Sequence, residues 1–324
     1  MEIDVANLML RDIRSGLELP DVAFLEAPTQ ISGGYDTEIH RCRLSHAPDS
    51  LSGELILRIF PYPVDGNRAI REAAIQNALN AEGLLVPKVH LTVAEPKASE
   101  KPFIVMECVS GETLLHQDEP ESSRLLGQTH GLIHQIDPEE VRAQLEANGI
   151  DDVFLANTLQ RIRMAGAQFG WAREVITWLE ENQPEEHRLS ICHGDFHKLN
   201  VMQANGLITG LLDWSNFSLM DATFDVANTK ISFSILARYL TEEGDFEVVD
   251  LDEVLDNYLD AYEMERELDE SNLGYYLTLR ATMILFLAAL KITKPYQHPM
   301  VVGDVCELIY RESVIQISPD DILD

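Results

Sequence analysis

The segment SICHGDFHKLNVMQANGLITGLLDWSNF, residues 190–217, gathers polar side chains that are suited to chemistry. Asp195 and Asn200 are five residues apart, and Asp213 follows thirteen residues later, after an apolar run. Between them the sequence predicts two short strands joined by an Asn-Gly pair, the strongest short signal for a hairpin. Such a hairpin would return Asp213 close to the point where the chain leaves Asn200.

These three side chains match the division of labour that phosphoryl transfer requires. The Asn200 amide oxygen and the Asp213 carboxylate are hard oxygen ligands, which suit Mg²⁺ bound together with phosphate oxygens and water. Asp195 is then left to accept a hydroxyl proton. One carboxylate would position the nucleophile, while the other groups hold the metal that neutralises the developing charge on the phosphate.

The composition limits the class of partner. At 324 residues the chain can bury a large core in one to three domains, with two the central expectation. Its formal charge is −31, from 55 acidic and 24 basic residues. A surface this negative repels phosphate backbones and anionic lipids, so we expect neither a nucleic acid nor a membrane as partner. It would suit a cationic ligand, although solubility or salt tolerance explains the same bias.

The cysteines and the apolar runs indicate a cellular compartment. Four cysteines are scattered without a C-x-x-C pair, so the sequence predicts neither a disulfide framework nor a cysteine zinc site. The acidic start lacks the pattern of a signal peptide, and the apolar run MILFLAAL is too short to span a bilayer. We therefore expect a cytoplasmic, reducing location.

The periodicity of apolar residues predicts a strand-rich first third and a helical remainder. The predicted strands cover residues 29–45 as a hairpin, 54–61, 200–203, 207–214 and 102–114, the last broken at Ser110-Gly111. The predicted helices cover residues 67–83, 122–137, 172–182, 251–270 and 273–293. The reactive side chains would therefore lie in loops at strand ends, where a rigid scaffold holds functional groups.

The motif HGDFHKLN followed by GLLDW resembles the catalytic segment of the aminoglycoside phosphotransferase and choline kinase-like enzymes. These enzymes form the small-molecule branch of the protein-kinase-like fold. Further segments resemble other parts of the family in the same order. They are ISGGYDTEIHRCRL (nucleotide-covering hairpin), LILRIFP (third strand), AIREAAIQNAL (first helix), FIVMECVSGETL (hinge), LLGQTHGLIHQID (helix ahead of the catalytic loop) and MDATFDVANT (segment after the metal aspartate).

The resemblance implies an α+β, protein-kinase-like fold of two lobes. Residues 1–108 would form the N-terminal lobe, whose antiparallel sheet covers the nucleotide. Residues 109–324 would form a mainly helical lobe with the catalytic loop and the acceptor site. The resemblance further implies ATP as phosphoryl donor, Mg²⁺ as metal and a small-molecule hydroxyl as acceptor. The choice between ATP and GTP and the oligomeric state stay open.

The resemblance also implies a role for each matching residue. Asp195 would be the catalytic base or the residue that orients the hydroxyl, and Asn200 and Asp213 would hold Mg²⁺. Arg58 stands where the family places a phosphate-binding Lys or Arg, and Glu72 would pair with it. The remaining nucleotide contacts would come from the backbones of Glu107 and Val109, at the adenine edge, and of Ser32, Gly33 and Gly34, at the phosphates.

Three features depart from protein kinases. The loop SGGYD lacks a complete G-x-G-x-x-G, so the phosphates would be covered more loosely or by side chains. Arg58 stands in place of the protein-kinase lysine. It keeps the positive charge, but its guanidinium offers a fork of hydrogen-bond donors where the lysine ammonium is a point charge. DWS stands in place of D-F-G, and no activation loop ending in A-P-E is present. The last feature fits a small-molecule kinase that is permanently assembled.

Several of these residues also have a structural interpretation. Arg58 and Glu72 could form a surface ion pair worth well under about 1 kcal/mol. His130 and His134 are spaced to bind zinc on a helix, but the sequence offers no evident third ligand, so His134 is predicted to be buried and hydrogen-bonded. Asp225 is predicted to cap the helix that follows it rather than to bind metal.

The acceptor is the least constrained part of the prediction. Residues 241–273 carry fourteen acidic residues and one basic residue, a pattern usually typical of a solvated face. In the resembling family this region walls the acceptor cleft, where acids would attract a polyamine-like substrate. An aminoglycoside-like or other cationic acceptor is therefore favoured, with choline, an amino alcohol or a sugar as alternatives. A non-catalytic nucleotide-binding module is disfavoured, because all three reactive side chains are present.

Overall fold

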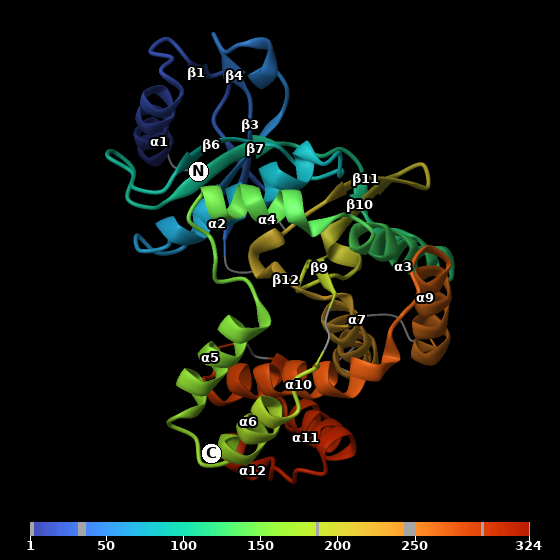
Figure 1. Ribbon diagram of the computed structural model, residues 1–324. Coiled ribbons are helices and arrows are strands. Elements are labelled where there is room, and N and C mark those ends of the chain that lie inside the picture. Colours follow the sequence, from blue (N-terminus) through green and yellow to red (C-terminus); the bar gives the residue numbers. More distant parts are fainter. Residues whose placement is uncertain (1–2, 32–36, 186–187, 243–249, 293–294, 324) are drawn as a thin grey trace. The chain divides into compact units, whose positions relative to one another are not determined.

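The computed structural model describes residues 3–31, 37–185, 188–242, 250–292 and 295–323. The chain divides into two compact units, each built from segments distant in sequence. The first comprises Met1–Glu112, Glu140–Ile150 and Met202–Ser215; the second comprises Thr113–Glu139, Asp151–Val201 and Asn216–Asp324. Together they form an α+β fold with an antiparallel-sheet N-terminal region and a mainly helical C-terminal region (Figure 1). The two-lobe division at residue 108 stays a prediction.

The first unit is built around a five-stranded antiparallel sheet. In spatial order its strands are β2 (Thr29–Ile31), β3 (Glu38–Cys42), β5 (Leu55–Ile59), β7 (Phe103–Glu107) and β6 (Val89–Val93). All five residues of β5 are buried, because apolar clusters cover both faces of the sheet. Leu55, Leu57 and Ile59 face the cluster of helix α1 (Ile3–Leu17), and Ile56 faces that of helix α2 (Gly66–Ala81). A strand covered on both sides has a nearly continuous apolar sequence, as Leu55–Ile59 does apart from Arg58.

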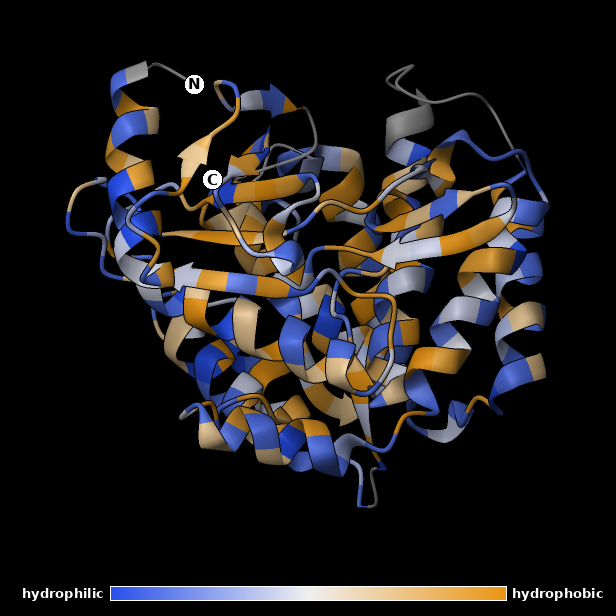
Figure 2. Cartoon of the chain, turned by 90° about the horizontal axis from the view of Figure 1, so that it is seen from above, coloured by the Kyte–Doolittle hydropathy of each residue, from blue (hydrophilic) through white to orange (hydrophobic). Residues whose placement is uncertain are grey.

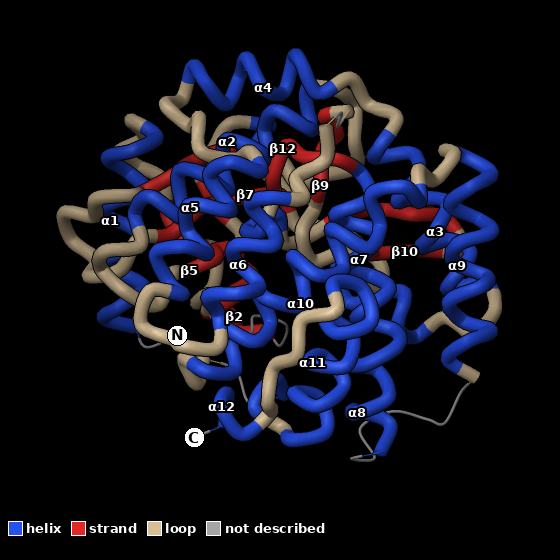
Figure 3. Tube along the Cα trace, turned by 60° about the horizontal axis from the view of Figure 1, so that its bottom comes forward, coloured by secondary structure: helices blue, strands red, loops and turns tan. Residues whose placement is uncertain are grey.

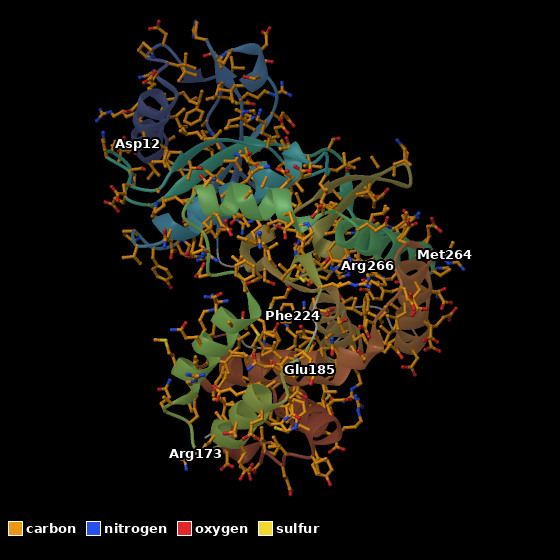
Figure 4. All side chains as sticks on the ribbon, in the orientation of Figure 1. Asp12, Arg173, Glu185, Phe224, Met264 and Arg266 are labelled. Atoms are coloured by element: carbon orange, nitrogen blue, oxygen red, sulfur yellow. The ribbon has the colours of Figure 1, made fainter. Side chains whose placement is uncertain are left out.

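Helix α1 was not predicted from the sequence. Apolar and polar segments alternate along it (Figure 2), and its apolar residues Met9, Leu10 and Ile13 join the core of the sheet. Asp12, labelled in Figure 4, is buried and accepts hydrogen bonds from the backbone N–H groups of residues 97–99 at 2.7 to 3.2 Å. This carboxylate therefore ties α1 to the loop between β6 and β7.

Two smaller sheets accompany the main one. Strands β1 (Ala23–Phe24) and β4 (Leu44–Ser45) form an antiparallel pair. A three-stranded sheet contains β11 (Leu207–Leu211), β10 (Val201–Ala204) and β8 (Glu112–Thr113), in that order, and helix α4 (Pro138–Ala147) also falls mainly in this unit. Asn205 and Gly206, between β10 and β11, have φ angles of 54° and 76°. Both central residues thus adopt the left-handed conformation that an Asn-Gly hairpin requires, which confirms the predicted turn.

The second unit is mainly helical, with one short antiparallel pair formed by β9 (Leu189–Cys192) and β12 (Ser218–Asp221) (Figure 3). Its helices are α3 (Glu121–His134), α5 (Leu155–Gly166), α6 (Ala172–Glu181), α7 (Ala222–Ile231), α8 (Ala237–Glu242), α9 (Leu251–Glu265), α10 (Leu273–Ala289), α11 (Pro299–Ser313) and α12 (Asp320–Leu323). Tyr275, Tyr276 and Leu279 of α10 are buried in its core, and Met283 packs at the edge of the cluster. None of the described helices is long and apolar enough to cross a bilayer.

Helices α3 and α9 lie side by side (Figure 1). A Cβ atom at Gly127 of α3 would lie 2.0 Å from the carbonyl oxygen of Tyr258 on α9, so this helix contact requires glycine. This close approach lets Tyr258 and Tyr262 reach His130 and His134, which lie one and two turns further along α3.

We expect Gly127→Ala to destabilise the protein by about 2 kcal/mol or more, because a methyl group would push α9 away from α3. Gly303 of α11 is the matched control: nothing lies within 4 Å of the position of its added Cβ, so Gly303→Ala should stabilise its helix by up to about 1 kcal/mol. Urea unfolding of both variants measures the difference. Equal effects would contradict the close packing of α3 on α9.

Candidate active site

The loop that carries Asp195 follows strand β9 and begins at Gly194, a position that requires glycine. Gly194 has a φ of +79°, and a Cβ there would lie 2.1 Å from the carbonyl oxygen of Asn216. The backbone N–H groups of His193 and Gly194 donate to the two carboxylate oxygens of Asp225, at 2.5 and 2.8 Å. Asp225 is completely buried. A buried side chain therefore fixes the two peptide N–H groups that directly precede Asp195.

Asp225 stays ionised because of the groups around it. Burial acts to raise the pKa of its carboxyl group, but His130 and His134 outweigh burial and hold the pKa well below its usual value. The Nε2 atoms of the two rings lie 3.0 and 3.5 Å from Asp225 Oδ2. The prediction that Asp225 caps a helix is wrong: α7 begins three residues earlier, and its cap is Asp221, which accepts from the N–H of Thr223 at 2.8 Å.

Asp195 itself is partly exposed, and neighbouring side chains stabilise its ionised carboxylate. Its Oδ2 lies 3.6 Å from Nε2 of His197. Burial acts to raise the pKa of Asp195, but His197, His193 and Arg280 outweigh it, so the pKa lies below its usual value. A carboxylate that is ionised near neutral pH can accept a hydrogen bond from a hydroxyl group.

Asn200 ends the short 3₁₀ turn η3 (Lys198–Asn200) and turns back towards the loop. Its Nδ2 atom donates to the backbone carbonyl of Asp195 at 2.9 Å and lies 3.4 Å from Nε2 of His197. Within the described part of the chain, no hydrogen bond uses its amide oxygen. The amide is thus anchored through its nitrogen, and the oxygen is left to serve as a hard ligand.

Two side chains that the sequence did not single out hold the carbonyl group of Gly194. Asn228 of α7 donates to this oxygen at 3.3 Å, and Arg280 of α10 lies 3.5 Å from it and also donates to the Asn228 side-chain oxygen. The Arg280 guanidinium covers the ring of Phe224, labelled in Figure 4, at 5.1 Å. A signal was present: Arg280 is a single charge inside an apolar helical run, and such charges are buried only when they have partners.

Lys198 is largely buried, with a side chain that is 13% exposed. Its Nζ atom pairs with the carboxylate of Glu119 and donates to Ser122 Oγ at 2.9 Å, next to the ring of Phe233. Burial lowers the pKa of Lys198 to about 8. The lysine therefore connects the Asp195 loop to the start of α3.

In the first unit, Arg58 lies between two carboxylates. It projects from β5 on the same side as Ile56, towards α2, and its Nη1 atom lies 3.1 Å from Glu72 Oε1. Its Nη2 atom donates to Asp213 Oδ1 at 3.1 Å. The Arg58 and Glu72 side chains are 5% and 1% exposed, so the interpretation as a surface ion pair is excluded. Gln76 donates to Glu72 at 3.2 Å and helps to fix its direction.

Asp213 has a strained backbone and an accessible side chain. Its φ is 60°, unusual for a residue with a Cβ, and its carboxylate is 32% exposed. Ser215 Oγ donates to Asp213 Oδ1 at 2.7 Å. Arg58, Glu72 and Asp213 together carry one net negative charge, which suits a cation ligand.

The other predicted nucleotide contacts are placed as follows. Glu107 ends β7, and its N–H already donates to the Lys88 carbonyl at 3.0 Å. Val109 follows two residues later, and among the described residues no group accepts its N–H. Ser32, Gly33 and Gly34 lie outside the described residues.

The histidine pair on α3 does have a third polar neighbour, contrary to the sequence prediction. One ligand atom from each of His130, His134 and Asp225 lies within 4.8 Å of the other two. However, the Nδ1 atoms contact the hydroxyl groups of Tyr258 and Tyr262 at 2.7 and 2.9 Å, and Asp225 already accepts two backbone N–H groups. We therefore interpret the cluster as a hydrogen-bonded network. The prediction that His134 is buried and hydrogen-bonded is confirmed.

A sheet unit with a buried Arg–Glu pair and a helical unit with an H-G-D loop define the kinase-like class of phosphotransferases. Residues 29–272 match the model of the phosphotransferase enzyme family, and the chain belongs to this family. It is accordingly an enzyme of the phosphotransferase class. No curated protein gives a significant match to the sequence.

Solved structures of this fold are similar over most of the chain. A type VIII aminoglycoside-3'-phosphotransferase is 21% identical, with a TM-score of 0.55, over 85% of this chain and 98% of that one. The macrolide 2'-phosphotransferase MphH from Brachybacterium faecium is 17% identical, with a TM-score of 0.58, over 91% and 97%. The aminoglycoside phosphotransferase APH(4)-Ia, solved with ADP and hygromycin B, is 16% identical, with a TM-score of 0.57, over 93% and 98%. At these identities the likeness establishes the fold.

The burial of His134 predicts how the stability of the protein depends on pH. Burial lowers the pKa of His134 to about 3, below the value of about 6.5 expected in the unfolded chain. Below pH 6.5 the unfolded chain therefore binds a proton that the folded protein does not, and stability falls as the pH falls. From pH 7 to pH 5 this group should cost about 2 kcal/mol of unfolding free energy, and His134→Gln should remove that part.

Urea unfolding at both pH values measures the change, and replacement of the exposed His46 by Gln is the control. If the unfolding free energy depends on pH equally in His134→Gln and in the unmodified protein, His134 is not held neutral by burial.

Proposed function

We propose that this enzyme transfers the γ-phosphoryl group of ATP to a hydroxyl group of a small molecule. The observation that carries the proposal is the Asp195 loop, where a carboxylate with a lowered pKa lies on a backbone fixed by buried hydrogen bonds. Such a carboxylate accepts a hydrogen bond from the acceptor hydroxyl and directs its oxygen towards the phosphorus atom. Catalysis in this scheme is positioning and charge neutralisation, without a covalent enzyme intermediate.

Asn200 and Asp213 would hold Mg²⁺. Both supply hard oxygen atoms: the Asn200 amide is anchored through its nitrogen, and the Asp213 carboxylate is partly exposed. When bound, the metal would neutralise charge on the phosphate oxygens. Arg58, directed by Glu72, would add a fork of donors to those oxygens, which a lysine at this position does not offer.

The rest of the nucleotide would be held by backbone groups. The proposed contacts are Glu107 and Val109 at the adenine edge, and Ser32, Gly33 and Gly34 at the phosphates. The division into a nucleotide-covering lobe, residues 1–108, and an acceptor lobe, residues 109–324, belongs to the same proposal. Family membership supports it, and the complex of APH(4)-Ia with ADP supports an adenine nucleotide.

A cationic acceptor is favoured by an acidic hollow in the second unit. The hollow has a volume of about 230 Å³ and is lined by Glu119, Pro120, Asp250, Glu253, Val254 and Asn257. Glu119 is also the partner of Lys198, three residues from Asp195, which links this hollow to the catalytic loop. Lys198 offsets the charge of Glu119, whereas the exposed carboxylates of Asp250 and Glu253 remain to attract ammonium groups. The hygromycin B bound by APH(4)-Ia supports an acceptor of this kind.

A screen of ATP consumption across aminoglycosides, macrolides, choline and sugars, with GTP run in parallel, tests the function. We expect a cationic acceptor to be phosphorylated, with a mass increase of one phosphoryl group. Asp195→Asn should lower kcat about 100-fold or more, because the amide cannot take up the hydroxyl proton. The same variant should still bind ATP and Mg²⁺, with a rise in Tm on the order of 5 °C at saturation.

Two variants separate metal binding from general effects on stability. Asp213→Asn should lose the part of this Tm rise that requires Mg²⁺, and Asp49→Asn, an exposed residue of the same unit, should keep it. Absence of any Tm rise with ATP and Mg²⁺, or full turnover by Asp195→Asn, would refute the proposed function.

The acceptor class is tested at Glu253. Glu253→Gln should raise the KM for a cationic acceptor about fivefold at low salt, since it removes one attractive charge worth about 1 kcal/mol. Glu263→Gln changes an exposed acid on the same helix outside the hollow and should leave that KM unchanged. The difference should shrink as salt is added. Equal KM values for both variants would argue against binding in the acidic hollow.

A further inference from the structure

A chain of buried polar contacts runs from α9 to the catalytic loop. The hydroxyl group of Tyr258 lies 2.7 Å from Nδ1 of His130 on α3, and Nε2 of His130 lies 3.0 Å from Asp225 Oδ2. Asp225 in turn accepts the N–H groups of His193 and Gly194. Tyr258, His130 and Asp225 are all 0% exposed, so water does not compete for these hydrogen bonds.

The chemistry of the contacts decides where the hydrogens lie. An ionised Asp225 only accepts hydrogen bonds, so Nε2 of His130 must carry a hydrogen. In the neutral ring, Nδ1 then has a lone pair, and the hydroxyl of Tyr258 donates to it. Tyr258 thereby favours the His130 tautomer whose Nε2–H points at Asp225. A hydrogen bond to one ring nitrogen of a histidine commonly fixes the tautomer and orientation of the ring in this way.

His130 touches the loop a second time, independently of Asp225. Its ring stacks on the ring of Phe196, with centroids 4.2 Å apart and planes 29° from parallel. Phe196 directly follows Asp195 and is completely buried. The ring orientation that Tyr258 sets therefore acts on both sides of Asp195: on the peptide units ahead of it through Asp225, and on the residue after it by stacking.

We propose that Tyr258 and His130 are positioning residues of this enzyme, which hold the backbone on both sides of Asp195 in its reactive geometry. The assignment rests on the proposed function, because it gives Asp195 the acceptor hydroxyl as its partner. Neither residue touches the nucleotide or the acceptor in this scheme. Their loss should therefore lower kcat and leave both KM values unchanged, because a small displacement of a catalytic group slows the reaction much more than it weakens binding.

The first experiment compares two tyrosine-to-phenylalanine variants. Tyr258→Phe removes only the hydroxyl group that faces His130, and we expect kcat to fall about tenfold with both KM values within twofold. Tyr275→Phe is the matched control, because its buried hydroxyl donates to the Leu179 carbonyl at 3.1 Å, away from the loop. It should lower Tm by a similar amount and keep kcat. Equal kcat values for the two variants would overturn the proposal.

A second pair of variants tests which ring nitrogen matters. The side-chain amide of His130→Gln can reach the position of Nε2 and donate to Asp225, whereas that of His130→Asn matches Nδ1 and faces Tyr258. We expect the glutamine variant to retain at least five times the kcat of the asparagine variant. Equal activity would contradict a role for the contact with Asp225.

An NMR measurement keeps this inference separate from the proposed function. The ¹⁵N shifts of His130 should report an Nε2–H tautomer, and the amide signals of His193 and Gly194 should shift in Tyr258→Phe but not in Tyr275→Phe. These signals test the positioning role even if no acceptor is phosphorylated, a result that would defeat the proposed function alone. Unchanged amide signals, or a stoichiometric metal ion lost in His130→Gln, would overturn the hydrogen-bonded assignment.

Discussion

The arrangement of the second unit depends on one buried carboxylate. Isolating the charge of Asp225 from water would cost several kcal/mol, and such a charge is tolerated only when partners surround it. Two of its partners are N–H groups of the loop that carries Asp195, and the other two are imidazole rings of α3. The contacts that make the charge tolerable are thus the same contacts that shape the loop. Helices α3, α7 and α9 and the loop consequently stabilise one another through these contacts.

The first unit uses a buried charge differently. There the central group is a cation, Arg58, whose separate nitrogen atoms meet Glu72 and Asp213 at 3.1 Å each. The guanidinium fork allows both contacts at once, while its Glu72 side is almost completely buried and its Asp213 side is partly exposed. The buried contact fixes the direction of the arginine, and the exposed contact can exchange for another anion, such as a phosphate oxygen. An arginine at this position is therefore compatible with the proposed phosphate contact.

Local patterns in the sequence predicted much of this architecture. The apolar run of β5, the helical period of α2 and α10 and the Asn-Gly turn between β10 and β11 are all set by neighbours in the chain, and their predictions are confirmed. Strands β9 and β12 were missed because each is defined by its pairing with the other, which lies far away in the sequence. The roles of Asp225, Tyr258 and Arg280 were missed for a related reason. Their contacts join residues 31 to 128 positions apart, and no local pattern encodes such a contact.

Helix α9 shows why the acidic segment resists a single explanation. Its buried side carries Val254, Tyr258, Ala261 and Tyr262, which pack towards α3, and the opposite side carries acids. The acids near its start also stabilise the helix: Asp250 caps it by accepting from the N–H groups of Asp252 and Glu253, and negative charge at a helix N-terminus is favourable in itself. Some of the acidic surplus is thus explained by helix formation, and Asp250 both caps the helix and lines the hollow. Because Glu253 of the hollow lies on the same helix as Tyr258, a cation bound there would contact the helix whose Tyr258 hydroxyl contacts His130.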